Sequence, residues 1–251
     1  MTRLPDPPSE PQHPYIDLHH LDMLAASGIP PEHAYARGYE TISDPLRLHN
    51  LGFVNEVCAK HADGLLIPQL RINGTVWGHL YRPDSPRSRD GKPLKYEAPW
   101  RQSNHLDFPP GIQDRVNDPR YPIVFTEGTK KADAGAIWGL CAISLNGVWG
   151  FMGTNETTGL KTTLVDFRDI GLNNGREVWL AFDSDVAVNP KAAQGLCEFA
   201  DFLKLRGAAV SYVHFPHNGV KMGLDDFLVS GGTVEELRRL VKPTQPLIQD
   251  D

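Results

Sequence analysis

The chain has 251 residues, of which 40% are hydrophobic and 22% charged, so it is long enough to bury one large core or two smaller ones. No apolar stretch reaches the length of a membrane span, and three separated cysteines without a CxxC pair argue against a disulfide framework or a cysteine zinc site. The formal net charge of −6 argues against a basic nucleic-acid footprint over the whole chain. The first residues lack the apolar core of a signal peptide, and we expect a cytoplasmic protein without membrane association.

The first half of the chain is predicted to be α+β. Residues 1–14 carry five prolines and are expected to form a disordered tail. Helical periodicity then dominates up to residue 60, with Asp44 before Pro45 as the cap of one helix. Two β-rich runs flank Asn73-Gly74, which is a strong hairpin signal. The polar segment 85–100 is predicted to be a loop with one strand at Lys95-Tyr96.

From about residue 121 the pattern changes to apolar strands that alternate with helices. This alternation predicts a small parallel sheet with helices on both faces, which is an α/β architecture. Thr233 and Glu236 form a capping box that opens the last helix. We therefore divide the chain into a tail (1–14), an α+β part (15–120), an α/β domain (121–242) and a terminal tail or linker (243–251).

Acidic residues follow three of the predicted strands in the α/β domain. Glu127 ends the first strand, Asp183 and Asp185 end the third, and Asp225 follows the fourth. Ligands of open parallel sheets bind beyond the carboxyl ends of the strands, and carboxylates gathered there suit Mg²⁺. Each acid taken alone also fits a helix cap, and Asp225 with its neighbour fits the start of a helix. Their recurrence at successive strand ends favours a metal site.

A basic stretch lies before this domain. Between Arg71 and Arg101 the chain carries seven Lys or Arg against three Asp or Glu, which is a local excess of four positive charges. Tyr81, Tyr96 and Trp100 lie in the same stretch, and aromatic side chains stack on the bases of single strands. A solvated loop is the alternative explanation for such a run of charge.

The Glu-Gly pair after the first strand and the D-x-D after the third resemble the TOPRIM domain of DnaG-type primases, topoisomerases and some nucleases. The matching residues are Glu127, Gly128, Asp183 and Asp185. The resemblance implies a compact parallel-sheet domain whose acids bind Mg²⁺ or Mn²⁺.

The resemblance extends into the first half, because DnaG-type primases place a basic subdomain before TOPRIM. Here Arg82, Lys95 and Tyr96 match its pattern, so the likeness covers about residues 16 to 240. The combination of TEGTKKADA, FDSDV and KMGLDDFL looks closest to the TOPRIM primase-like domains of phages and plasmids. Two positions depart from DnaG-type primases: Lys131 and Gly223 stand where those primases usually carry acids. The departures leave the number of metal ions and full polymerase activity open.

The resemblance implies a primase-like nucleotidyltransferase that acts on a single-stranded DNA template with nucleoside triphosphates, with a replicative helicase as a further partner. The implied catalytic residues are Glu127, Asp183, Asp185 and Lys131, and Asp225 joins the three acids as a metal ligand. The residues expected to bind nucleotide or nucleic acid are Gly128, Lys130, Arg82, Lys95, Tyr96, Arg87 and Lys92.

Two other functions remain open. A metal-dependent nuclease would use the same acids, with His214 or His217 near the metal. A non-catalytic nucleic-acid-binding module of a replication complex is the second alternative, and Lys131 and Gly223 motivate it.

Overall fold

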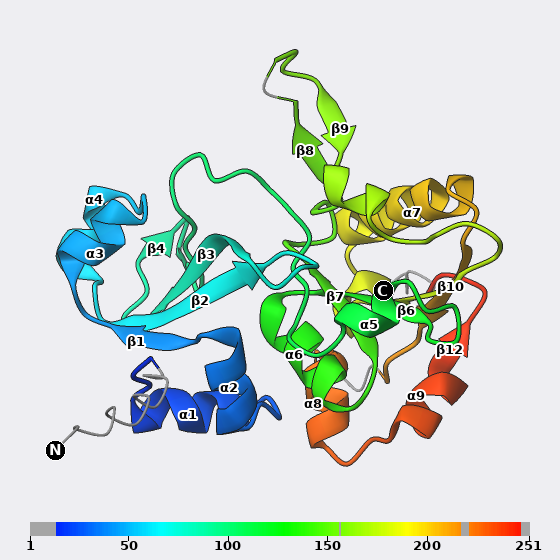
Figure 1. Ribbon diagram of the computed structural model, residues 1–251, viewed down its shortest axis with the longest axis horizontal. Helices are drawn as coiled ribbons and strands as arrows, with labels where there is room; N and C mark the ends of the chain where they lie inside the picture. The colour runs from blue at the N-terminus through cyan, green and yellow to red at the C-terminus, as the bar shows by residue number, and fades with distance from the viewer. Residues whose placement is uncertain (1–13, 156, 217–220, 247–251) are drawn as a thin grey trace, which may run out of the picture.

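The computed structural model describes residues 14–155, 157–216 and 221–246, which form two lobes (Figure 1). The N-terminal lobe is built on an antiparallel sheet in the order β1-β2-β3. Its elements are α1 (Leu18–Ala25), α2 (Pro31–Arg37), β1 (Glu40–Ile42), α3 (Pro45–Asn50), α4 (Asn55–Lys60), β2 (Gly64–Leu70) and β3 (Val76–Pro83). Residues of α1 and α2 share one apolar cluster with β2, and residues of α3 and α4 share a second one with β2 and β3.

The structure confirms two of the local predictions for this lobe and contradicts one. The Asp44 carboxylate accepts a hydrogen bond from the Leu46 N–H and caps α3, and β2 pairs with β3 around Asn73-Gly74, as the sequence predicted. The strand expected at Lys95-Tyr96 is wrong. A hairpin of β4 (Ser88–Arg89) and β5 (Lys92–Pro93) forms instead, because both residues of the Asp90-Gly91 turn adopt a positive φ, as a type I′ turn requires.

The C-terminal lobe carries a five-stranded sheet in the order β12-β11-β10-β6-β7. Four of its strands are parallel, as predicted, and β12 pairs antiparallel with β11 at one edge. The strands are β6 (Ile123–Glu127), β7 (Cys141–Leu145), β10 (Glu177–Ala181), β11 (Ala209–Val213) and β12 (Val241–Lys242). The helices are α5 (Gln113–Val116), α6 (Thr129–Ile137), α7 (Pro190–Leu205), α8 (Leu224–Val229) and α9 (Val234–Leu240).

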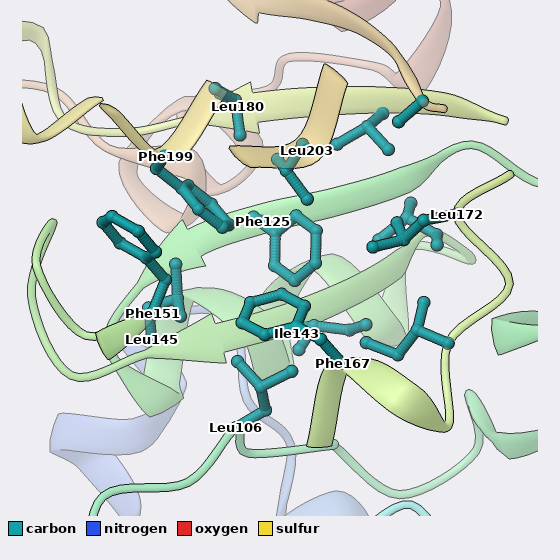
Figure 2. Close-up of a cluster of buried hydrophobic side chains, with 14 of the residues drawn as sticks. Leu106, Phe125, Ile143, Leu145, Phe151, Phe167, Leu172, Leu180, Phe199 and Leu203 are labelled. Carbon is teal, nitrogen blue, oxygen red and sulfur yellow. The ribbon is translucent and has the colours of Figure 1, made fainter. Parts of the chain in front are cut away.

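Alternate side chains of each strand enter different cores, which explains why the strands read as nearly continuous apolar runs. Phe125 and Leu180 pack with Phe199 and Leu203 of α7 in the larger core (Figure 2). Val124 and Trp179 point the other way and pack with residues of α6, α8 and α9 in the smaller core. The sheet is therefore covered by helices on both faces, as the sequence predicted.

Two features of this lobe were not predicted. The edge strand β12 forms from residues at the limit of the predicted domain. In the long connection after β7, β8 (Met152–Thr154) and β9 (Lys161–Thr163) pair as an arm that projects from the lobe (Figure 1).

No helix of the described residues has both the length and the apolar character needed to cross a bilayer.

A buried charge network joins the two lobes. Asp133 of α6 accepts hydrogen bonds from Arg37 Nε at 2.7 Å and from the Tyr39 hydroxyl at 2.6 Å. Arg37 also donates to Asp107 at 2.8 Å, and His33 Nε2 lies 3.0 Å from Asp133 Oδ1. These contacts lie up to 100 residues apart in the sequence, so they fix the position of α6 against the N-terminal lobe.

Candidate functional site

A cleft of about 690 Å³ lies between the lobes. Its N-terminal side is lined by Arg82, Lys95 and Tyr96. Its C-terminal side carries the strand-end acids and three lysines: Glu127, Lys130, Lys131, Asp183, Lys221 and Asp225. The structure thus brings two of the predicted cations of the first half and three of the four predicted strand-end acids to one cavity, and Asp185 is not among the residues that line it. Five cations face three carboxylates in this lining, so the cleft suits an anionic ligand.

Glu127 is the last residue of β6, and its carboxyl group enters the cleft. Gly128 follows with φ of 91°, a backbone conformation that side-chain-bearing residues rarely adopt, and it turns the chain into α6. A Cβ at Gly128 would meet no atom within 4 Å, so this turn faces open space. Burial, and then the nearby charge of Asp183, raise the pKa of Glu127.

The two aspartates of the D-x-D lie in different environments. Asp183 follows the end of β10 and its side chain is 3% exposed, whereas the side chain of Asp185 is 42% exposed. Lys221 joins them, with its Nζ at 2.8 Å from Asp183 Oδ2 and 2.8 Å from Asp185 Oδ2. Sequence reasoning missed Lys221. The available signal was a lysine two residues before Gly223, in the segment that brings Asp225 to the cleft.

Lys131 and Gly223 form one structural unit. The Lys131 ammonium lies 3.0 Å from Asp183 Oδ1. Burial acts to lower the pKa of this lysine, but the carboxylates of Asp183, Asp225 and Glu127 together outweigh burial and raise the pKa. A Cβ on residue 223 would lie 2.3 Å from Lys131 Cε and 2.6 Å from Asp183 Oδ1. Glycine therefore leaves the space in which the lysine reaches the aspartate. The two departures noted in the sequence are a single feature, a cation placed beside Asp183.

Two carboxylate oxygens of the cleft retain free acceptor capacity. Asp183 Oδ1 and Asp225 Oδ1 are buried and accept no hydrogen bond from the described residues, although Lys131 Nζ lies close to the first without hydrogen-bond alignment. Burial raises the pKa of Asp225. Unpaired buried carboxylate oxygens beside Glu127 are the donor set that a hard divalent cation prefers, so the residues present fit one such ion. The predicted ligand atoms of Glu127, Asp183 and Asp185 do not all lie within 4.8 Å of one another in this structure.

The remaining predicted binding residues divide into two groups. Lys130 lines the cleft and donates to Ser27 Oγ at 2.8 Å, and burial lowers its pKa. The Arg82 guanidinium donates to the Tyr96 hydroxyl at 3.1 Å and lies 5.4 Å from the centre of the same ring.

Arg87 and Lys92 lie outside the cleft. Arg87 is held by Glu97 at 2.6 Å and Glu56 at 2.8 Å, and Lys92 is exposed on β5. His214 Nε2 lies 2.8 Å from the carbonyl oxygen of Thr244 and does not line the cleft. His217 is outside the described residues.

A histidine pair lies outside the cleft, on α1. His19 Nε2 and His20 Nε2 approach the carboxylate of Asp84 at 3.2 and 2.9 Å. His20 is buried, and its Nδ1 lies 2.7 Å from the hydroxyl of Thr41. These contacts fix α1 against β1 and the end of β3.

Comparison with known proteins places the fold. A family model described as a domain of unknown function (DUF3854) matches residues 113–235. An uncharacterized protein of Picosynechococcus sp. strain PCC 7002 is 29% identical over 205 residues, which are 69% of this chain and 20% of that protein.

Solved primase structures share the fold over most of the chain. The Aquifex aeolicus primase (zinc-binding and RNA polymerase domains) gives a TM-score of 0.60 at 17% identity, over 89% of this chain and 55% of that one. The DnaG catalytic core gives 0.59 at 14% identity, over 89% and 73%. A DnaG primase catalytic domain bound to single-stranded DNA gives 0.56 at 14% identity, over 90% and 74%.

The chain therefore has the fold of DnaG-type primase catalytic cores, as the sequence resemblance implied. It spans about a fifth of the Picosynechococcus protein and about half of the Aquifex primase chain.

Proposed function

We propose that this chain carries a TOPRIM-type site for nucleotidyl transfer on a single-stranded DNA template, in a primase-like protein of the kind found in phages and plasmids. The observation that supports the proposal best is the composition of the interlobe cleft. Strand-end acids from β6 and β10 face Arg82, Lys95 and Tyr96 across one cavity of about 690 Å³. Acids alone suit a metal, and cations alone suit a phosphate, but a template-directed transfer needs both in one place.

Glu127 and Asp183 would hold one Mg²⁺ or Mn²⁺, with Asp225 beside them, because all three carboxyl groups line the cleft and those of Asp183 and Asp225 each keep one buried oxygen without a hydrogen bond from the described residues. Such an ion offsets the charge of the transferred phosphoryl group and orients its oxygens. Asp185 is the more exposed acid and is already paired with Lys221.

The side chains of this protein would bind and position the reactants. Lys130 lies at the start of α6 inside the cleft and would meet the phosphates of a nucleoside triphosphate. Lys131 and Lys221 hold the Asp183 carboxylate between two ammonium groups, at 3.0 and 2.8 Å. These contacts fix the position of the Asp183 carboxylate, and they supply positive charge where a second divalent ion would otherwise be required.

The N-terminal lobe would hold the template strand. Arg82 and Lys95 offer charge to its phosphates, and the ring of Tyr96, 38% exposed, offers a face for a base. Base stacking on an aromatic side chain contributes about 1–3 kcal/mol per base in proteins that bind single strands.

The test is incorporation of labelled nucleotides on single-stranded DNA with Mg²⁺ or Mn²⁺, with ribo- and deoxynucleoside triphosphates supplied separately. We expect primers from the wild-type chain and none from Glu127→Gln or Asp183→Asn, with DNA binding retained. Cleavage of the template instead would assign the same acids to a nuclease. Absence of both products, with DNA binding intact in wild type and variants, would identify a non-catalytic module.

A further inference from the structure

A second and larger groove, of about 1020 Å³, lies on the C-terminal lobe beside the β8–β9 arm. Among the described residues that line it none is acidic, although the chain as a whole has a net charge of −6. Four cations line it, each from a separate segment of the chain. They are Arg101 in the connection between β5 and α5, Lys161 on β9, Arg168 at the end of the 3₁₀ helix Val165–Arg168, and Arg206 at the C-cap of α7.

These four cations are available to a ligand. All four side chains belong to exposed residues, and within the described residues none has a carboxylate oxygen within 4.0 Å. Lys161 Nζ donates a hydrogen bond to the Thr154 hydroxyl at 3.2 Å, and Arg206 donates one to the carbonyl oxygen of Phe167. Asp166, which lies in the chain between the lining residues Val165 and Arg168, is buried and paired with His105 at 3.0 Å. Four such cations gathered on one concave surface without a neutralising carboxylate indicate an anionic ligand.

The groove borders the interlobe cleft. Asn146 lines the cleft and donates to Asn104 Oδ1 at 3.1 Å, and Asn104 lines the groove. The amide of Asn104 also donates to the carbonyl oxygens of Gly150 and Met152, at 2.7 and 3.2 Å. The segment after β7 therefore separates the two cavities by one pair of hydrogen-bonded amides. Neutral amides of this kind do not repel a phosphate backbone that crosses from one cavity to the other.

We propose that this groove binds the phosphodiester backbone of a nucleic-acid strand that extends out of the interlobe cleft, with the β8–β9 arm alongside it. That the same strand also occupies the interlobe cleft rests on the proposed function. Cations spread over four segments match the repeated charges of a polymer better than the single charge centre of a small phosphate ester. Beside Met152, Leu164 and Val165, the lining carries amides and hydroxyls such as Gln102, Thr162 and Thr163, which suit sequence-independent contacts.

The experiment measures binding of fluorescent single-stranded DNA to the full chain in EDTA, over a range of salt concentrations, so that no catalysis contributes. Lys161→Gln combined with Arg168→Gln removes two exposed charges of the groove. The matched control, Lys191→Gln combined with Lys204→Gln, removes two exposed charges from α7 outside the groove. Circular dichroism and thermal unfolding should be the same for all three proteins.

We expect the groove variant to lose about 1.4 from the slope of log affinity against log salt, since each single-strand phosphate contact contributes about 0.7. That change corresponds to about 25-fold weaker binding at about 0.1 M salt. The loss should appear with a strand of roughly 20 nucleotides and vanish with one of roughly 5, which fills only the cleft. The control should match the wild type at both lengths.

Equal affinity of the groove variant and the control for the long strand would overturn the proposal, as would an equal loss for the short strand. A Glu127→Gln background separates this outcome from failure of the proposed function. In that background, the two groove substitutions should still weaken binding of the long strand and not of the short one. If they do so while neither the wild type nor any variant incorporates nucleotides, the groove proposal is supported and the catalytic assignment is wrong.

Discussion

Removal of the Asp133 carboxylate should destabilise the whole protein. Asp133 is fully buried and accepts hydrogen bonds from Arg37 and Tyr39 at 2.7 and 2.6 Å, with His33 at 3.0 Å. Asp133→Ala leaves these groups without their partner, and a broken buried ion pair costs about 3–5 kcal/mol. Asp107 remains paired with Arg37 at 2.8 Å, so we expect about 4 kcal/mol rather than a separate cost for every orphaned donor.

The assay is urea unfolding and thermal unfolding, each followed by tryptophan fluorescence and circular dichroism. For a chain of this size, about 4 kcal/mol corresponds to a decrease of about 8–16 °C in the melting temperature. Asp201→Ala is the control, because Asp201 is 63% exposed in a pair with Lys204 and should change the free energy of unfolding by less than about 0.5 kcal/mol. A loss below about 1 kcal/mol for Asp133→Ala would refute the argument that this network holds α6 and its lysines against the N-terminal lobe.

Three further predictions concern the cleft and α1. Gly223→Ala should reduce nucleotide incorporation about tenfold, because the new Cβ would lie 2.3 Å from Lys131 Cε. In a double-mutant cycle, Gly223→Ala should cause a smaller loss of incorporation when Lys131 has already been replaced by alanine. Lys221→Met should raise the number of bound Mn²⁺ ions measured by calorimetry, since it removes the ammonium that lies 2.8 Å from both Asp183 and Asp185, and an unchanged number would contradict the replacement of an ion by ammonium. Burial lowers the pKa of His20 below 6.5, so the unfolded chain binds the extra proton and the free energy of unfolding should fall as pH drops below that value. The urea midpoint should therefore decrease less in His20→Gln than in wild type between about pH 7.5 and about pH 5.5.

The C-terminal lobe could be predicted from sequence because its signals are local. Apolar runs such as that of β6 favour burial on both sides, and capping residues such as Asn189 and Thr233 mark where helices begin. Edge elements were harder to predict. β12 has two residues and no apolar run, and its pairing with β11 depends on where α9 returns the chain.

The acids at the strand ends could be predicted from the sequence, but the lysines that pair with them could not. Glu127, Gly128 and the D-x-D are recognisable in the chain because strand order places carboxyl ends at one edge of a sheet. Nothing local to Asp183 indicates that Lys221 and Lys131 lie at 2.8 and 3.0 Å from it, because these contacts span 38 and 52 residues.

By itself the sequence determined the two-part architecture, the sheet and the acids at its edge, because apolar periodicity and turn chemistry act over a few residues. Only the tertiary structure decided which cations those acids meet, that Gly223 leaves room for Lys131, and that Arg87 is already neutralised by Glu97 and Glu56. It also revealed the basic groove beside the β8–β9 arm, whose cations are spread from Arg101 to Arg206. Charges so far apart in the chain come together only through packing, which no short stretch of sequence encodes.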